Sequence, residues 1–386
     1  MKRFVLCLLV ILSSVFVVFA EDAVTETTYY KVSYPEGVSA VANIESILDG
    51  YFTYFNSVFR FDRSGPGFKY LVRIFASKSD FNAYVKEKTG TNKDPQSETV
   101  FLRYPTKENS ELAVLKSSVS SSSFIRQLFV QYIYGFATDV PAWVLAGFPL
   151  MFEHSEWKSG KVSARSGENP WLEPAKVIAK DGSKGLTAMK MLSADRTTYS
   201  LDVFMPQAYL LARFFTEAPF ADCNRLFTDG IFLIKTGATG DTFLSYQRDW
   251  LPVNRLEASY RDYVASLRNV RDVTSEGITL YAQGKTDAAI ARFHEVLEMD
   301  DSNSVAMYYI GLCMYAQSRY VDAEGWYNRA LSADSGQNHA YIYWGLATAA
   351  IADKRFEEAI PHLENAKKSD AANFTARVDE LMEQIK

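Results

Sequence analysis

Apolar residues in the first two thirds of the chain follow two different periods. Alternating β-forming side chains predict strands at 28–34 and 70–75, and two shorter apolar runs, 99–104 and 112–115, predict a hairpin. Apolar residues spaced three and four apart predict helices between and after these strands. The predicted helices span 38–59, 80–88, 122–135, 141–153 and much of 202–267, with a loop over 166–170. This mixture predicts an α+β domain over residues 21–267.

The last third of the chain is helical by pattern and contains an internal repeat. A small residue, a second small residue, a large apolar residue and a further apolar residue recur in three copies. The three sets are Gly277, Ala289, Phe293 and Leu297; Gly311, Ala323, Tyr327 and Leu331; and, after a two-residue insertion, Ala347, Ala359, Leu363 and, one residue early, Ala366. The period of 34 residues resembles that of tetratricopeptide repeats. The resemblance implies an all-α solenoid of about three repeats over 268–386, closed by a capping helix at 374–386.

The resemblance also implies a binding surface. In tetratricopeptide arrays, the first helix of each repeat lines a concave face, and the family offsets place six side chains of this chain there. We call these six the predicted groove: Tyr281, Tyr308, Leu312, Tyr315, Tyr341 and Trp344. Aromatic side chains on a rigid curved surface are common anchors for peptides, which predicts a protein or peptide partner. The alternative is that several of them pack beneath the neighbouring domain or the capping helix.

A second resemblance concerns the front domain. The segment 141–153 reads PAWVLAGFPLMFE and resembles the segment that follows the zinc helix in peptidase-MA-like gluzincin metalloproteases. The order of strands and helices over 28–88 and the helical region up to Trp250 also resemble that family. The resemblance implies a zincin-like fold over 21–267. An unrelated α+β domain is the alternative.

The residues that such an enzyme needs are replaced. The resemblance places the two zinc-binding histidines at Arg126 and Val130, the water-activating glutamate at Gln127 and the third zinc ligand at Ala146. None of these side chains can hold zinc or accept a proton from water. The chain has four histidines, and none lies between residues 21 and 153. The sequence therefore predicts a pseudopeptidase without metal or other cofactor.

The N-terminus predicts export. Lys2 and Arg3 precede an apolar stretch over 4–19, and small residues at Val18 and Ala20 fit a cleavage site. This pattern predicts a cleaved signal peptide at 1–20 and a periplasmic or secreted protein, with an uncleaved anchor as the alternative. No later apolar run is long enough to span a membrane.

The net charge of the chain argues against one class of ligand. The formal net charge of −5 disfavours nucleic acid as a ligand, because phosphate binding needs a basic face. We therefore expect an exported, non-catalytic adaptor that binds a partner through the predicted groove. Two alternatives remain: a binder of envelope peptides or glycans that uses the inactive cleft, and a hydrolase with a non-standard site.

Overall fold

The structure is a computed structural model that describes residues 23–35, 37–165, 167–195, 197–217, 227–231, 233 and 253–385. The predicted signal peptide and the region 234–252 therefore lie outside the described residues. The chain divides into two compact units, Met1–Thr138 with Trp157–Val162 and Asp139–Glu156 with Ser163–Lys386. The predicted domain boundary at 267/268 lies within the second unit. Among the described residues, no helix is both long and apolar enough to cross a membrane.

A mixed sheet forms the centre of the first unit. The strand order is β1-β2-β3-β5-β4, in which β2, β3 and β5 run parallel and the two outer strands, β1 and β4, run antiparallel to their neighbours. The strand bounds are β1 Ala23–Glu26, β2 Tyr30–Tyr34, β3 Tyr70–Phe75, β4 Thr99–Leu102 and β5 Glu111–Leu115. The predicted hairpin is the antiparallel pair of β4 and β5, and β5 also pairs with β3.

Three helices pack on this sheet: α1 (Ile44–Phe59), α2 (Lys78–Thr89) and α3 (Ser122–Phe136). Alternate residues of β3 point to opposite faces, so Phe75 packs with Phe81 of α2 while Tyr70 reaches α3. The Tyr70 hydroxyl donates to the carbonyl oxygen of Tyr132 at 2.7 Å. Aromatic rings fill the space between α1 and α3, where Phe55 contacts Phe129 edge-on at 5.4 Å.

Two sequence predictions for this region need correction. The predicted helix 38–59 begins only at Ile44, because Asn43 has a φ of 58° and no helix continues through that left-handed backbone. The stretch after the helix at 141–153 contains a hairpin that the pattern did not predict. Its strands are β6 (Ser155–Lys158) and β7 (Lys161–Ala164). The turn between them has positive φ at Ser159 and Gly160.

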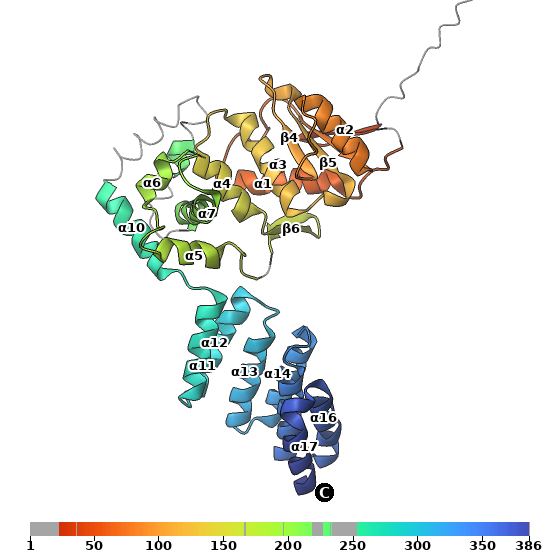
Figure 1. The fold of residues 1–386 in the computed structure, drawn as a ribbon, viewed down its shortest axis with the longest axis vertical. Helices are drawn as coiled ribbons and strands as arrows, with labels where there is room; N and C mark the ends of the chain where they lie inside the picture. Colours follow the sequence, from red (N-terminus) through yellow and green to blue (C-terminus); the bar gives the residue numbers. More distant parts are fainter. Residues whose placement is uncertain are drawn as a thin grey trace, which may run out of the picture. The chain divides into compact units, whose positions relative to one another are not determined.

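The second unit begins with helices that pack closely (Figure 1). They are α4 (Ala142–Phe152), α5 (Leu172–Lys180), α6 (Ala188–Ser193), α7 (Leu201–Glu217) and α10 (Val253–Ser266). A Cβ at Gly147 would lie 2.1 Å from the carbonyl oxygen of Ala208, so α4 and α7 can cross only because this residue is glycine. Trp143 of α4 packs against Phe215 of α7 at 5.4 Å. Helices α5 and α6 were not predicted.

The helices from residue 270 onward complete the second unit and stack as three successive antiparallel pairs followed by a single helix (Figure 1). They are α11 (Val270–Ala282), α12 (Thr286–Met299), α13 (Ser304–Ala316), α14 (Tyr320–Ala333), α15 (His339–Ala352), α16 (Phe356–Ser369) and α17 (Ala371–Ile385). Helix α17 is the predicted capping helix and starts three residues earlier than expected. The starts of α12, α14 and α16 reproduce the predicted spacing and the two-residue insertion.

Candidate functional site

Each helix pair is held together by the small and large residues of the repeat. A Cβ at Gly277 would lie 2.6 Å from the Phe293 ring, and a Cβ at Gly311 would lie 2.4 Å from the Tyr327 ring. The rings therefore rest directly on the backbone of the facing helix. In the third pair the smaller Leu363 faces Ala347, and both are fully buried in one apolar cluster. In the first two pairs a glycine on one helix faces an aromatic ring on the other, whereas in the third pair an alanine faces a leucine.

The turns inside the three pairs share one backbone geometry. Gly284, Ser318 and Lys354 all have left-handed φ values, of 73°, 59° and 62°. In each turn the next residue donates its N–H to a carbonyl near the end of the first helix, as Arg355 does to Ala350 at 2.8 Å. This pattern is a Schellman-type ending, which favours glycine. The turn therefore persists in the second and third pairs although the glycine is lost.

The six residues of the predicted groove lie on the first helix of each pair. Tyr281 lies on α11, Tyr308, Leu312 and Tyr315 lie on α13, and Tyr341 and Trp344 lie on α15. Tyr341 is 46% exposed, whereas the other five are half-buried and pack on the apolar clusters beneath them.

Neighbouring rings join the middle of this surface. Tyr309 lies 5.7 Å from both Tyr281 and Tyr308, edge-on in each case. Tyr308 also contacts the buried ring of Tyr327 at 5.7 Å. Burial, and secondarily the neighbouring Tyr309, raises the pKa of Tyr308 to about 12, so its hydroxyl stays protonated and able to donate. The middle of the predicted groove is an aromatic surface with hydroxyl donors.

The last part of the predicted groove adds a cation. Tyr341 and Trp344 contact the buried Phe374 of α17, at 5.2 Å and 5.8 Å between ring centroids. The guanidinium of Arg377 lies over the Trp344 ring, 4.7 Å from its centroid. Arg377 is exposed, and among the described residues no carboxylate pairs with it. Arg377 is not among the six residues of the predicted groove, although its position one helical turn after Phe374 places both on one face.

The first repeat is bonded to helix α5 of the same unit. Asn269 caps α11 by accepting from the N–H of Asp272 at 2.8 Å, and its amide donates to Glu173. The N–H of Val270 donates to Glu168 at 2.7 Å, and Lys176 pairs with Asp272. The start of α11 is thus held by side chains of α5 and of the loop before it, and one of its backbone donors, the N–H of Val270, is satisfied by Glu168.

The four positions that the gluzincin resemblance assigns to zinc binding are divided between the two units. Arg126, Gln127 and Val130 are half-buried on α3, and Ala146 is buried on α4. A cation, an amide, an aliphatic side chain and a methyl group supply no zinc ligand set. Across the described residues, no three His, Cys, Asp or Glu side chains gather as a possible metal site.

Stacked antiparallel helix pairs of this kind define an α-solenoid. A tetratricopeptide-repeat family model matches residues 274–338, which confirms the predicted repeat type for that part of the chain. No curated protein sequence matches the chain.

Several solved structures are similar to part of the chain. The first tetratricopeptide domain of Spaghetti (RPAP3), bound to the HSP90 peptide SRMEEVD, is 21% identical, with 30% of this chain and 89% of that chain covered and a TM-score of 0.28. The first tetratricopeptide domain of human RPAP3 gives the same identity and TM-score, with 30% and 88% covered. MamA AMB-1 is 20% identical, with 52% and 98% covered and a TM-score of 0.26.

Proposed function

We propose that this protein is a non-catalytic adaptor that binds a peptide or protein segment along the first helices of its repeats. The observation that carries the proposal is the row of aromatic side chains on α11, α13 and α15, which ends in the exposed Tyr341 and the cation of Arg377. The family match over 274–338 supports the same assignment.

The chemistry of this row suits a peptide with apolar anchors. Tyrosine, tryptophan and arginine are the residue types that most often dominate the free energy of protein binding. Their rings are held from below by buried neighbours, so little side-chain entropy remains to be lost on binding. Arg377 adds a site for one acidic side chain of the partner, close to the apolar anchor at Tyr341 and Trp344.

The proposal extends to the front of the chain. We infer a zincin-like domain that has lost its catalysis, from the resemblance of segment 141–153 and the replacement of the four metal-site positions. The mixed sheet with α1 and α3 is compatible with that origin. Export is part of the proposal as well and is based on the signal-like pattern of residues 1–20.

The test is to select peptides from a random display library with the full chain and to measure their affinity by titration calorimetry. Tyr341→Ala should weaken binding by about thirtyfold, because an aromatic anchor residue contributes ~2 kcal/mol or more. Its melting temperature should change little, since nearly half of the side chain is exposed. Arg377→Gln should weaken only those peptides that carry an acidic residue.

A matched control is Val321→Ala. Val321 is 70% exposed on α14, the second helix of its pair, and lies outside the predicted groove. The assignment would be contradicted if the selected peptides bound Tyr341→Ala as tightly as the unmodified protein. It would also be contradicted if Val321→Ala weakened binding as much as Tyr341→Ala does. A large fall in melting temperature for Tyr341→Ala would show that the ring is a packing residue instead.

A further inference from the structure

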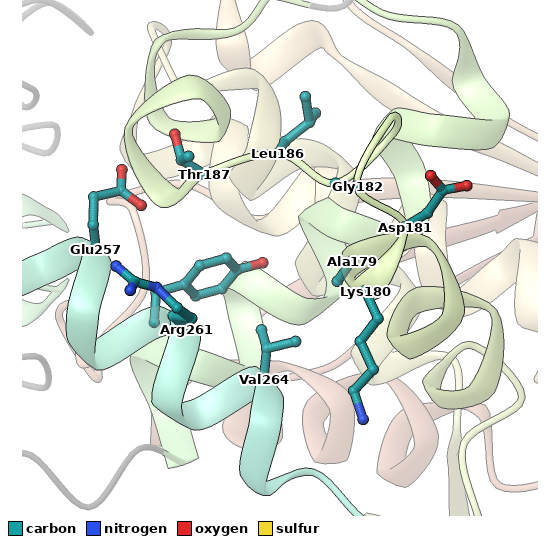
Figure 2. A pocket seen from close by; sticks show the side chains of 11 residues that line it. Ala179, Lys180, Asp181, Gly182, Leu186, Thr187, Glu257, Arg261 and Val264 are labelled. Carbon is teal, nitrogen blue, oxygen red and sulfur yellow. The ribbon is translucent and has the colours of Figure 1, made fainter.

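A pocket of about 460 Å³ lies within the second unit, away from the predicted groove residues. It is formed by the end of α5, the loop between α5 and α6, and one face of α10 (Figure 2). Its volume falls in the range of roughly 300–1,000 Å³ that is usual for small-molecule sites. Leu186, Tyr260 and Val264 provide apolar surface in the lining.

The loop that forms one wall has a fixed shape. Gly185 donates its N–H to the carbonyl oxygen of Asp181 at 2.7 Å, and a Cβ at Gly185 would lie 2.7 Å from the carbonyl oxygen of Ala179. The N–H of Leu186 donates to the amide oxygen of Gln207, which is fully buried. The wall is therefore held by hydrogen bonds to the rest of the unit and is preformed.

The two carboxylates of the lining are already occupied by the chain itself. Asp181 accepts from both the hydroxyl and the N–H of Ser183, and these bonds hold the pKa of Asp181 below its usual value. Glu257 accepts from the N–H groups of Ala188 and Met189, at 3.1 Å and 2.8 Å. Both acidic groups stabilise the loop and the start of α6, which leaves them less free to bind a ligand.

The lining also contains two cations. Lys180 comes from the α5 side of the pocket and Arg261 from the α10 side (Figure 2). Both are exposed, and neither has an ion-pair partner among the described residues. The formal charges of the four groups sum to zero, and the two cations are the ones that form no ion pair within the described part of the chain.

Tyr260 supplies a donor as well. The residue is 4% exposed, and its hydroxyl is buried with no hydrogen-bond partner among the described residues. Its ring is held edge-on against Phe214 at 5.3 Å. Burial, followed by the nearby Glu257, raises the pKa of Tyr260 well above its usual value, so the hydroxyl remains a donor. A buried donor without a partner is costly, which favours a ligand that accepts from it.

We propose that this pocket binds a small apolar molecule that ends in a carboxylate. The apolar part lies against Leu186 and Val264, while the carboxylate is held by Lys180, Arg261 and the hydroxyl of Tyr260. A medium-chain fatty acid and the C-terminal residues of a peptide share this chemistry. The inference does not depend on the adaptor function proposed for the repeats.

The experiment compares acids with matched neutral molecules on the full chain by titration calorimetry. Octanoate is paired with octanol, and N-acetyl-Leu-Phe is paired with its C-terminal amide. We expect at least one acid to bind at least about tenfold more tightly than its neutral partner, because hydrogen bonds to a charged group are stronger than those to a neutral one. The acid that binds more tightly identifies the source of the carboxylate.

Three variants then locate the site. Tyr260→Phe removes only the hydroxyl and Arg261→Gln only the charge, and each should reduce the preference for the acid by about tenfold. Lys184→Gln is the control, because Lys184 is an exposed lysine of the same loop that does not line the pocket. Circular dichroism of each variant verifies folding, and Arg261→Gln, at an exposed position, is the variant least able to disturb it.

Three outcomes would overturn the proposal. If each acid and its matched neutral molecule bound with equal affinity, Lys180 and Arg261 would not bind a carboxylate. Unchanged acid binding in both Tyr260→Phe and Arg261→Gln would place the ligand elsewhere. Absence of binding by both acids at millimolar concentration would leave the pocket without the proposed ligand.

Discussion

Substitution of Gly311 by alanine tests the way in which the repeats pack. An added Cβ would lie 2.4 Å and 2.6 Å from two carbons of the Tyr327 ring, where ordinary contacts are about 3.5–4.0 Å. The ring has little room to move away, because Gly345 of α15 also lies against it. A Cβ built there would be 2.8 Å from the same ring. The ring of Tyr327 thus lies close to the backbone of two glycines, and the residue is fully buried.

The expected magnitude follows from two opposing terms. Overpacking a core costs about 1–3 kcal/mol, while alanine is better than glycine inside a helix by up to ~1 kcal/mol. Gly311→Ala should therefore lower the free energy of unfolding by about 1–2 kcal/mol. The measurement is urea unfolding of the full chain followed by far-ultraviolet circular dichroism, compared at equal m-value.

The control is Gly325→Ala in α14. An added Cβ at Gly325 meets no atom within 4 Å, so only the helix-propensity gain remains and the variant should be more stable by up to about 1 kcal/mol. If Gly311→Ala proves as stable as Gly325→Ala, the close packing of the ring is refuted. The double variant Gly311→Ala, Tyr327→Leu reproduces the Ala347 and Leu363 pair and should be more stable than the sum of its single changes implies.

Three further predictions concern the turns, the start of the repeats and the metal. Lys354→Gly should raise the free energy of unfolding by about 0.5–1 kcal/mol, because Lys354 has a φ of 62°, while Gly284→Ser should lower it. Asn269→Ala should cost ~1–2 kcal/mol, more than the equivalent cap variant Asn303→Ala, because Asn269 also bonds to Glu173. The purified full chain should contain no stoichiometric zinc by elemental analysis.

Each of these has a result that would contradict it. A less stable Lys354→Gly would mean that its side chain, not its backbone, determines the turn. If Asn269→Ala and Asn303→Ala lowered the free energy of unfolding in urea equally, the bond to Glu173 would contribute nothing to stability. One zinc per chain, lost on substitution of Gln127, would contradict the pseudopeptidase hypothesis.

Local patterns in the sequence predicted most helices and the repeat, because the spacing of apolar residues shows which face of a helix is buried. Gly277 with Phe293 and Gly311 with Tyr327 could be recognised since the repeat places them at fixed offsets. The pairing of β5 with β3 could not be predicted, because it joins strands separated by a helix and another strand. Helices α5 and α6 are short, and so little periodicity reveals them.

The candidate sites were predicted only in part. The six groove positions came from the spacing of tetratricopeptide repeats. How far each side chain is exposed depends on residues outside that spacing, such as Phe374 of α17, which contacts Tyr341. Whether they bind a partner remains a prediction. The pocket beside Tyr260 has no sequence signal, because its two walls lie about 75 residues apart and meet only through tertiary packing.

The bonds between α5 and the first repeat limit how this solenoid can evolve. One end of the stack is closed by Glu168, Glu173 and Lys176, and the other end is closed by α17. A new repeat added at either end would need to replace a specific closing contact. A duplication in the interior would need only the generic interface between pairs. Lengthening of the array, natural or engineered, should therefore be tolerated between α14 and α15 and resisted at both ends.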